Sequence, residues 1–340
     1  MNYYLFSQVL LTLESTGMFT NLICLVVLTR PQMRSPINFL LASLAVVDFL
    51  GLGFSMWSNL IWDGLSPKPC LSRDVAVQHF IAFLSSGVMV YGMNSWLTSV
   101  IAVTRYVVVT RVSVEFTMIH AQVLVFVSVI PSVIQYIPEY LWPRMSSRYH
   151  NSTVSESDIN KTCFQIDFLE LNSTQERIYA WYKFVFTFIP CLVLVIFSVL
   201  LVSVILKGRK QHVILRGDSW RQTSVTSSSL RRSSSVTSSS ALKVWRRTTR
   251  TTTMLLALSV SSVISRSPII ALMVLAELER MNYFVYIQYI SYVLVDINSG
   301  LNLIFFVISK EFRITLKHLF RKRTVRSSYN LGNSRFSRSS

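Results

Sequence analysis

Five ionisable side chains stand out inside, or at the end of, apolar runs that are long enough to cross a membrane. They are Glu14, Asp48, Arg105, Arg266 and Asp296. A charge within a bilayer is costly, so such residues usually pair, face a polar cavity or serve a function. Arg105 ends its run and is therefore either an anchor at the membrane edge or a functional cation. Asp48 lies in the middle of its run and must be protonated, paired or neutralised by a cation.

Neutral amides from other apolar runs could complete a cation site with Asp48. Asn94 and Asn298 each carry an amide oxygen. Carboxylate and amide oxygens suit a hard cation, so one interpretation is a sodium ion at Asp48. The other interpretation is a hydrogen-bonded cluster between helices that holds no ion. The four cysteines form no cluster with metal-site spacing, and we predict no other cofactor.

Arg266 and Asp296 are the only opposite charges in the last two apolar runs. A buried pair between them would satisfy both charges, and we favour this interpretation. Alternatively, Asp296 is available to receive a cationic group of a ligand. Arg266 also precedes Pro268 by two residues, and a proline bends a helix and removes a backbone hydrogen bond.

Composition and pattern place the chain among membrane proteins. Of its 340 residues, 51% are hydrophobic and 14% are charged, whereas soluble domains average about 25% charged residues. Seven runs are long enough for a spanning helix of about 20 residues. They cover residues 5–29, 37–61, 76–108, 119–141, 179–206, 252–276 and 284–308. No alternating pattern recurs along the chain, so the predicted fold is an all-α bundle of seven transmembrane helices and not a β-barrel.

Several function classes fit the sequence poorly. The five histidines are scattered over loops and the ends of runs, so we predict that the chain is not an enzyme. The net charge of +17 does not indicate nucleic-acid binding, because eleven Lys and Arg lie in 207–250 and nine in 310–340. In both segments they lie between or after apolar runs. A transporter or channel is the least favoured alternative, since no internal repeat is visible.

Two signals agree on the topology. All three glycosylation sequons lie in the segment 144–177, at Asn151, Asn160 and Asn172. The basic segments 207–250 and 310–340 favour the cytosol. Both signals are satisfied by a plasma-membrane protein with an odd number of spans, an extracellular N-terminus and a cytoplasmic C-terminus.

The segments outside the runs are predicted to differ in order. Residues 207–250 are rich in Ser, Thr and Arg, and we expect a largely disordered loop. Its Ser233, Ser234 and Ser235 follow two arginines and are either phosphorylation sites or part of a solvated spacer. Residues 310–323 predict an amphipathic helix on the inner leaflet, and residues 324–340 predict a disordered tail.

These features together resemble rhodopsin-like, class A G-protein-coupled receptors. The matching residues are Asn21, Leu44-Ala45-x-x-Asp48, Arg105-Tyr106, Pro190, Pro268, Asn302 and Lys310-Glu311-Phe312-Arg313. The resemblance implies one receptor domain over residues 1–323, with residues 310–323 as an eighth helix. It further implies heterotrimeric G proteins as partners, and arrestin, kinases and membrane lipids as further ones. A disulfide between Cys70 and Cys163 is also implied.

Specific roles follow from the same resemblance. Arg105 and Tyr106 would couple to the G protein. The ion or polar pocket would comprise Asp48, Asn94, Asn298, Ser299 and Asn302. The ligand pocket would comprise Tyr91, Arg266, Ile270, Met273, Gln288, Tyr289, Tyr292 and Asp296.

The ligand class is inferred from further motifs. Met33-Arg34-Ser35-Pro36, Trp96-Leu97-Thr98 and Arg247-Thr248-Thr249-Arg250 resemble the invertebrate FMRFamide, myosuppressin and sex-peptide receptors. This resemblance implies an amidated neuropeptide as ligand. Serpentine chemoreceptors of the nematode type carry similar motifs, so a receptor for small environmental molecules is the alternative.

The sequence departs from the class A pattern around Arg105. Acidic residues usually precede this arginine and stand at the cytosolic foot of the sixth span, but Thr104 and Thr248 occupy these positions. We therefore expect weaker restraint of the inactive state and raised basal signalling. The aromatic toggle of the sixth span is replaced by Ser265-Arg266-Ser267-Pro268.

Overall fold

The computed structural model is a helical bundle, as predicted. It describes residues 3–65, most of 77–110, 115–141, 143–149, 162–168, 173–222, 251–271 and 284–319. Helical segments occupy all seven predicted runs. They are α1 (Tyr3–Leu28), α2 (Pro36–Leu65), α4 (Asn94–Thr110) together with the described helical residues among 77–93, α5 (Met118–Leu141), α6 (Ser173–Gln222), the helix Thr251–Ala271, and α8 (Phe284–Gly300) with α9 (Asn302–Val307).

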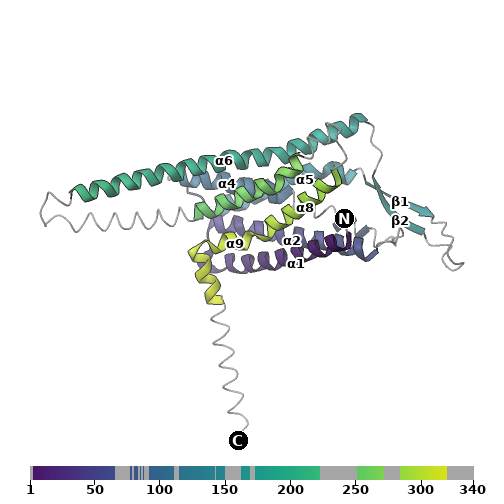
Figure 1. Ribbon diagram of the computed structural model, residues 1–340, viewed down its shortest axis with the longest axis horizontal. Helices are drawn as coiled ribbons and strands as arrows, with labels where there is room; N and C mark the ends of the chain where they lie inside the picture. The colour runs from purple at the N-terminus through teal and green to yellow at the C-terminus, as the bar shows by residue number, and fades with distance from the viewer. Residues whose placement is uncertain are drawn as a thin grey trace, which may run out of the picture.

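The helices lie side by side, with α1 packed along α2 and α8, and α4 packed between α2, α5 and α6 (Figure 1). The start of α1 and the strands β1 and β2 lie at one end of the bundle, which we call the hairpin end. The last turns of α6 and the helix Lys310–Leu319 lie at the opposite end. These two ends are those that the predicted topology assigns to the outside and the cytosol.

Apolar side chains face outward along the bundle. Five described helices are long and apolar enough to cross a membrane, and α8–α9 adds a sixth if its bent continuation is counted with it. Phe126 of α5 is 80% exposed and Ile119 is 70% exposed. Exposed apolar side chains of this size are unfavourable in water and suit a lipid environment.

Helix α2 begins at the end of the bundle opposite the hairpin end, and two residues there favour the start of a helix. The Ser35 hydroxyl accepts the backbone N–H of Asn38 at 3.2 Å, and Pro36 occupies the first helical position. Ser before the first turn and Pro within it are both typical of helix starts. The Asn38 side chain then donates to the Met33 carbonyl oxygen at 2.6 Å, which ties α2 to the preceding turn (Pro31–Met33).

Two segments differ from the prediction. Helix α6 continues to Gln222, so residues 207–222 are helical where we expected disorder. Lys, Arg and Gln recur there and favour helix. Strands β1 (Pro143–Tyr149) and β2 (Thr162–Phe168) form an antiparallel hairpin that we did not predict. Phe164, Ile166 and Phe168 alternate with polar residues, and this short signal indicates a strand.

The chain turns sharply after α9. The helix Val293–Val307 and the helix Lys310–Leu319 meet at an angle of 92°. Phe312 is buried at the turn and its ring packs against Phe306, with centroids 5.8 Å apart. Lys310, Arg313 and Lys317 are exposed, so the amphipathic character predicted for this helix is confirmed over residues 310–319.

Two glycines allow α1 and α8 to approach closely. A Cβ atom at Gly17 would lie 3.6 Å from the Cα of Gly300 and 2.7 Å from Cδ1 of Leu52.

We expect Gly17→Leu to lower the unfolding temperature of the purified protein by about 5 °C, because overpacking costs about 1–3 kcal/mol. Gly17→Ala is the control, since a shift of the Leu52 side chain accommodates one methyl group. Unfolding of Gly17→Leu at the wild-type temperature would contradict the tight contact.

Candidate functional site

A hydrogen-bonded network surrounds the buried Asp48 in the middle of the bundle. Its Oδ1 accepts the Asn94 amide N–H and, at 3.0 Å, the Ser299 hydroxyl. Its Oδ2 accepts the amide N–H of Asn302. Asp48 is fully buried, and hydrogen bonds to an ionised acceptor are about twice as strong as neutral ones. The carboxylate therefore joins α2 to α4, α8 and α9.

The first helix joins this network through Asn21. Its amide donates to the carbonyl oxygens of Ser299 at 2.8 Å and of Gly17 at 2.9 Å. Its Oδ1 accepts the Asn302 amide at 3.2 Å. Asn302 thus donates to both Asp48 and Asn21. Because the chain turns between α8 and α9 at Leu301, these contacts fix the position of that break.

The helix Thr251–Ala271 contributes a cation to the same network. The Arg266 guanidinium donates to Asn94 Oδ1, and also to the carbonyl oxygen of Ser262 at 3.4 Å. Asn298 donates to the Ser262 hydroxyl at 3.3 Å. Arg266 is only 2% exposed. Its charge is thereby placed one amide group away from Asp48, while the predicted pairing with Asp296 stays a prediction.

A second acidic site lies between α1, α2 and α8, nearer to the hairpin end. Glu14 is fully buried, and its Oε1 accepts the Ser55 hydroxyl at 2.6 Å and the Asn59 amide at 2.7 Å. Asp296 is 5% exposed and interacts electrostatically with Glu14. Two buried carboxylates repel one another, so this site favours a positively charged group.

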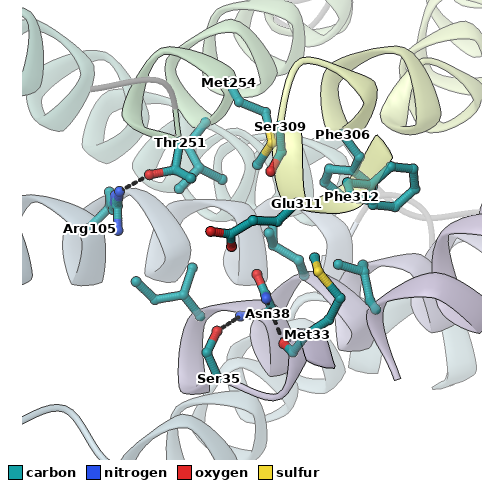
Figure 2. A pocket seen from close by; sticks show the side chains of 14 residues that line it. Met33, Ser35, Asn38, Arg105, Thr251, Met254, Phe306, Ser309, Glu311 and Phe312 are labelled. Atoms are coloured by element: carbon teal, nitrogen blue, oxygen red, sulfur yellow. Dashed lines mark hydrogen bonds between the residues drawn. The ribbon is translucent and has the colours of Figure 1, made fainter. Parts of the chain in front are cut away.

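A cavity of about 200 Å³ opens at the opposite end, between α1, α2, α4, the helix Thr251–Ala271 and the helix Lys310–Leu319. Arg105 lines it and donates a hydrogen bond to the Thr251 hydroxyl (Figure 2). Figure 2 also shows the Glu311 carboxylate pointing into this cavity. One cation and one carboxylate from different helices therefore share one space.

The second predicted coupling residue lies beside Arg105. The Tyr106 ring packs edge to face on Phe197 of α6, with ring centroids 5.5 Å apart. Ser99, about two turns earlier on α4, donates to the Pro190 carbonyl oxygen at 2.9 Å. Helix α4 is therefore fixed to α6 at two levels.

Other predicted site residues are only partly described. Ile270 is half-buried on the helix Thr251–Ala271, and Gln288, Tyr289 and Tyr292 lie along α8. Cys163 lies on β2, and the disulfide with Cys70 stays a prediction. The remaining predicted positions lie outside the described residues: Tyr91, Met273, Cys70, Asn151, Asn160, Asn172, Ser233, Ser234 and Ser235.

The roles of four residues of the site were not predicted from the sequence. Thr251 was assigned no role, although it is the hydroxyl that binds Arg105. Glu311 was noted only as part of the helix-eight motif, although it lines the Arg105 cavity. Ser55 and Asn59 lie one turn apart on α2, and this spacing of polar residues on an apolar helix is the signal that could have predicted the Glu14 site.

Comparisons with known proteins relate the chain to a receptor family and to a curated receptor. The family model described as serpentine type 7TM GPCR chemoreceptor Srw matches residues 8–323. The G-protein coupled receptor dmsr-1 of Caenorhabditis elegans is 25% identical over 224 residues, which cover 58% of this chain. The match covers 41% of that receptor, so the chain corresponds to less than half of the length of this curated relative.

Proposed function

The chain belongs to the Srw family of serpentine seven-transmembrane G-protein-coupled chemoreceptors, and we propose that its ligand is an amidated neuropeptide. Membership supports the proposal of a multi-pass membrane receptor that takes an extracellular ligand and activates a G protein. The family is the one that the sequence analysis gave as its alternative. The rhodopsin-like classification and the neuropeptide ligand are therefore parts of the proposal.

The observation that carries the ligand class is the buried pair of carboxylates Glu14 and Asp296. A guanidinium binds carboxylates through charge-assisted hydrogen bonds, and a peptide that ends in Arg-Phe-amide presents one. Both carboxylates lie on helices that begin at the hairpin end, which we propose to be extracellular. In this orientation, Arg105 and its cavity face the cytosol and the G protein.

Small cationic molecules are the second candidate ligands. The same carboxylates would bind an amine, and the family description is that of chemoreceptors. The two candidates differ in what else they contact, because a peptide also requires the outer ends of the helices and the hairpin. A screen with amidated Arg-Phe peptides and with small amines on the same cells separates them.

Substitution of Asp296 tests the proposed site. We expect Asp296→Asn to weaken binding of an Arg-Phe-amide peptide by roughly 30-fold, because loss of one member of a buried charge pair costs about 2–5 kcal/mol. A peptide with citrulline in place of arginine should bind both receptors equally weakly. Radioligand competition on membranes measures both affinities.

The matched control is Glu115→Gln, which removes an exposed carboxylate from the segment between α4 and α5. It should leave peptide affinity unchanged. If Asp296→Asn weakens the arginine and citrulline peptides by the same factor, the carboxylate does not bind the guanidinium. If only small amines activate the receptor, the second candidate replaces the first.

A further inference from the structure

We propose that Arg266 is the built-in counter-cation of Asp48, in the role that a bound sodium ion would otherwise fill. This pairing belongs to the polar network in the middle of the bundle and does not depend on the ligand. It replaces two expectations from the sequence, the sodium ion at Asp48 and the pairing of Arg266 with Asp296.

The orientation of Asn94 is the first argument. Its N–H group points to the carboxylate of Asp48, and its carbonyl oxygen points to the guanidinium of Arg266. An amide between an anion and a cation adopts this orientation, because its donor binds the negative group and its acceptor binds the positive one. The reverse orientation would place donor against donor and acceptor against acceptor.

Occupancy of the oxygen atoms is the second argument. Asp48 already accepts N–H or O–H groups from Asn94, Ser299 and Asn302. Two amide oxygens were expected to coordinate sodium. Asn94 Oδ1 accepts Arg266 instead, and Asn298 Oδ1 is the one that is left without a hydrogen-bond partner. A sodium ion would have to displace several of these donors, and the adjacent guanidinium would repel it. The donor set present therefore does not fit a sodium ion.

Electrostatic balance is the third argument. Asp48 and Arg266 are both at least 98% buried, since their exposed fractions are 0% and 2%, and they interact electrostatically. A buried charge is stable only when it is paired and hydrogen-bonded. With Arg266 present, the network carries one negative and one positive charge without any added ion. The bond to Asn94 also links the helix Thr251–Ala271 to α4, so helix position and charge balance are coupled.

A double-mutant cycle tests the pairing. Arg266→Met, Asp48→Asn and the double variant are compared by the thermal unfolding of the purified receptor in detergent. Each single change should lower the unfolding temperature, because it leaves one buried charge uncompensated. The double variant should unfold at a higher temperature than the sum of the two losses predicts. Arg313→Met, which removes an exposed arginine, is the matched control and should change little.

A parallel cycle with Asp296→Asn distinguishes the two candidate partners of Arg266. If the losses of unfolding temperature from Arg266→Met and Asp48→Asn are additive, the proposal is overturned. If only Asp296→Asn restores the unfolding temperature of Arg266→Met, Arg266 pairs with Asp296 and the proposal is likewise overturned.

Sodium provides an independent readout. Replacing N-methyl-glucamine chloride by sodium chloride at constant ionic strength should not change the unfolding temperature of the wild type, but should raise that of Arg266→Met. Stabilisation of the wild type by sodium would also overturn the proposal.

Discussion

Arg105→Ala is expected to abolish G-protein activation while ligand binding remains. Arg105 is 8% exposed, lies near the end of α4 and lines the cavity at the proposed cytosolic end. Its hydrogen bond to Thr251 joins α4 to the helix Thr251–Ala271 at this end. Alanine removes the cation that faces the cavity, and the carboxylates Glu14 and Asp296 lie elsewhere in the bundle. Stimulated signal should therefore fall to the level of mock-transfected cells, measured with a panel of G-protein biosensors.

Surface expression and peptide affinity must be measured on the same cells, because a misfolded receptor would also be silent. Arg313→Ala is the matched control, since it removes an exposed arginine from the helix Lys310–Leu319. It should retain most of the response. A full stimulated response from Arg105→Ala at normal surface expression would contradict the coupling role and leave Arg105 as an anchor at the membrane edge.

The helices could be predicted because the bilayer imposes a simple rule on the sequence. A spanning segment must satisfy its backbone hydrogen bonds internally, so apolar runs of about 20 residues become helices. The same rule marks the polar residues, since a group such as Asp48 cannot face lipid. Asp48, Asn94 and Asn302 lie on different helices but meet in one network. Their burial was expected because a polar side chain that faces lipid is energetically costly.

The partners of each polar residue could not be predicted in the same way. Which side chains meet depends on the rotation and depth of each helix, and an apolar run does not determine either. Arg266 could reach α4 or α8, and the structure places it against Asn94. Glu311 follows a sharp turn of 92° after α9, so its approach to the Arg105 cavity depends on a tertiary angle.

Glu311 bears directly on the expected basal activity of the receptor. The two acidic residues that usually restrain the arginine are replaced by Thr104 and Thr248. The cavity nevertheless holds one carboxylate, contributed by another helix (Figure 2). A cavity of about 200 Å³ is smaller than most ligand sites, which span about 300–1,000 Å³.

Thr251→Glu and Glu311→Gln should therefore shift basal signalling in opposite directions. Thr251→Glu places a carboxylate where a hydroxyl now binds Arg105. A hydrogen bond to a charged group contributes about 1.5–3 kcal/mol, and 1.4 kcal/mol in favour of the inactive state lowers the active fraction about tenfold. Basal signal per surface receptor should fall by about this factor. Thr251→Gln, similar in size but uncharged, is the control and should lower it much less.

Glu311→Gln removes the native carboxylate, and basal signal should rise several-fold. Lys310→Gln, a neighbouring change at an exposed position, should leave it unchanged. The opposite changes of basal signal in Thr251→Glu and Glu311→Gln exclude a trivial cause, because damage to the fold would lower the signal in both variants. An unchanged basal signal in Glu311→Gln, at normal surface expression, would mean that its carboxylate does not restrain Arg105. If the basal signal then falls only in Thr251→Glu, the native receptor has no carboxylate that restrains Arg105. One added carboxylate is enough to supply that restraint.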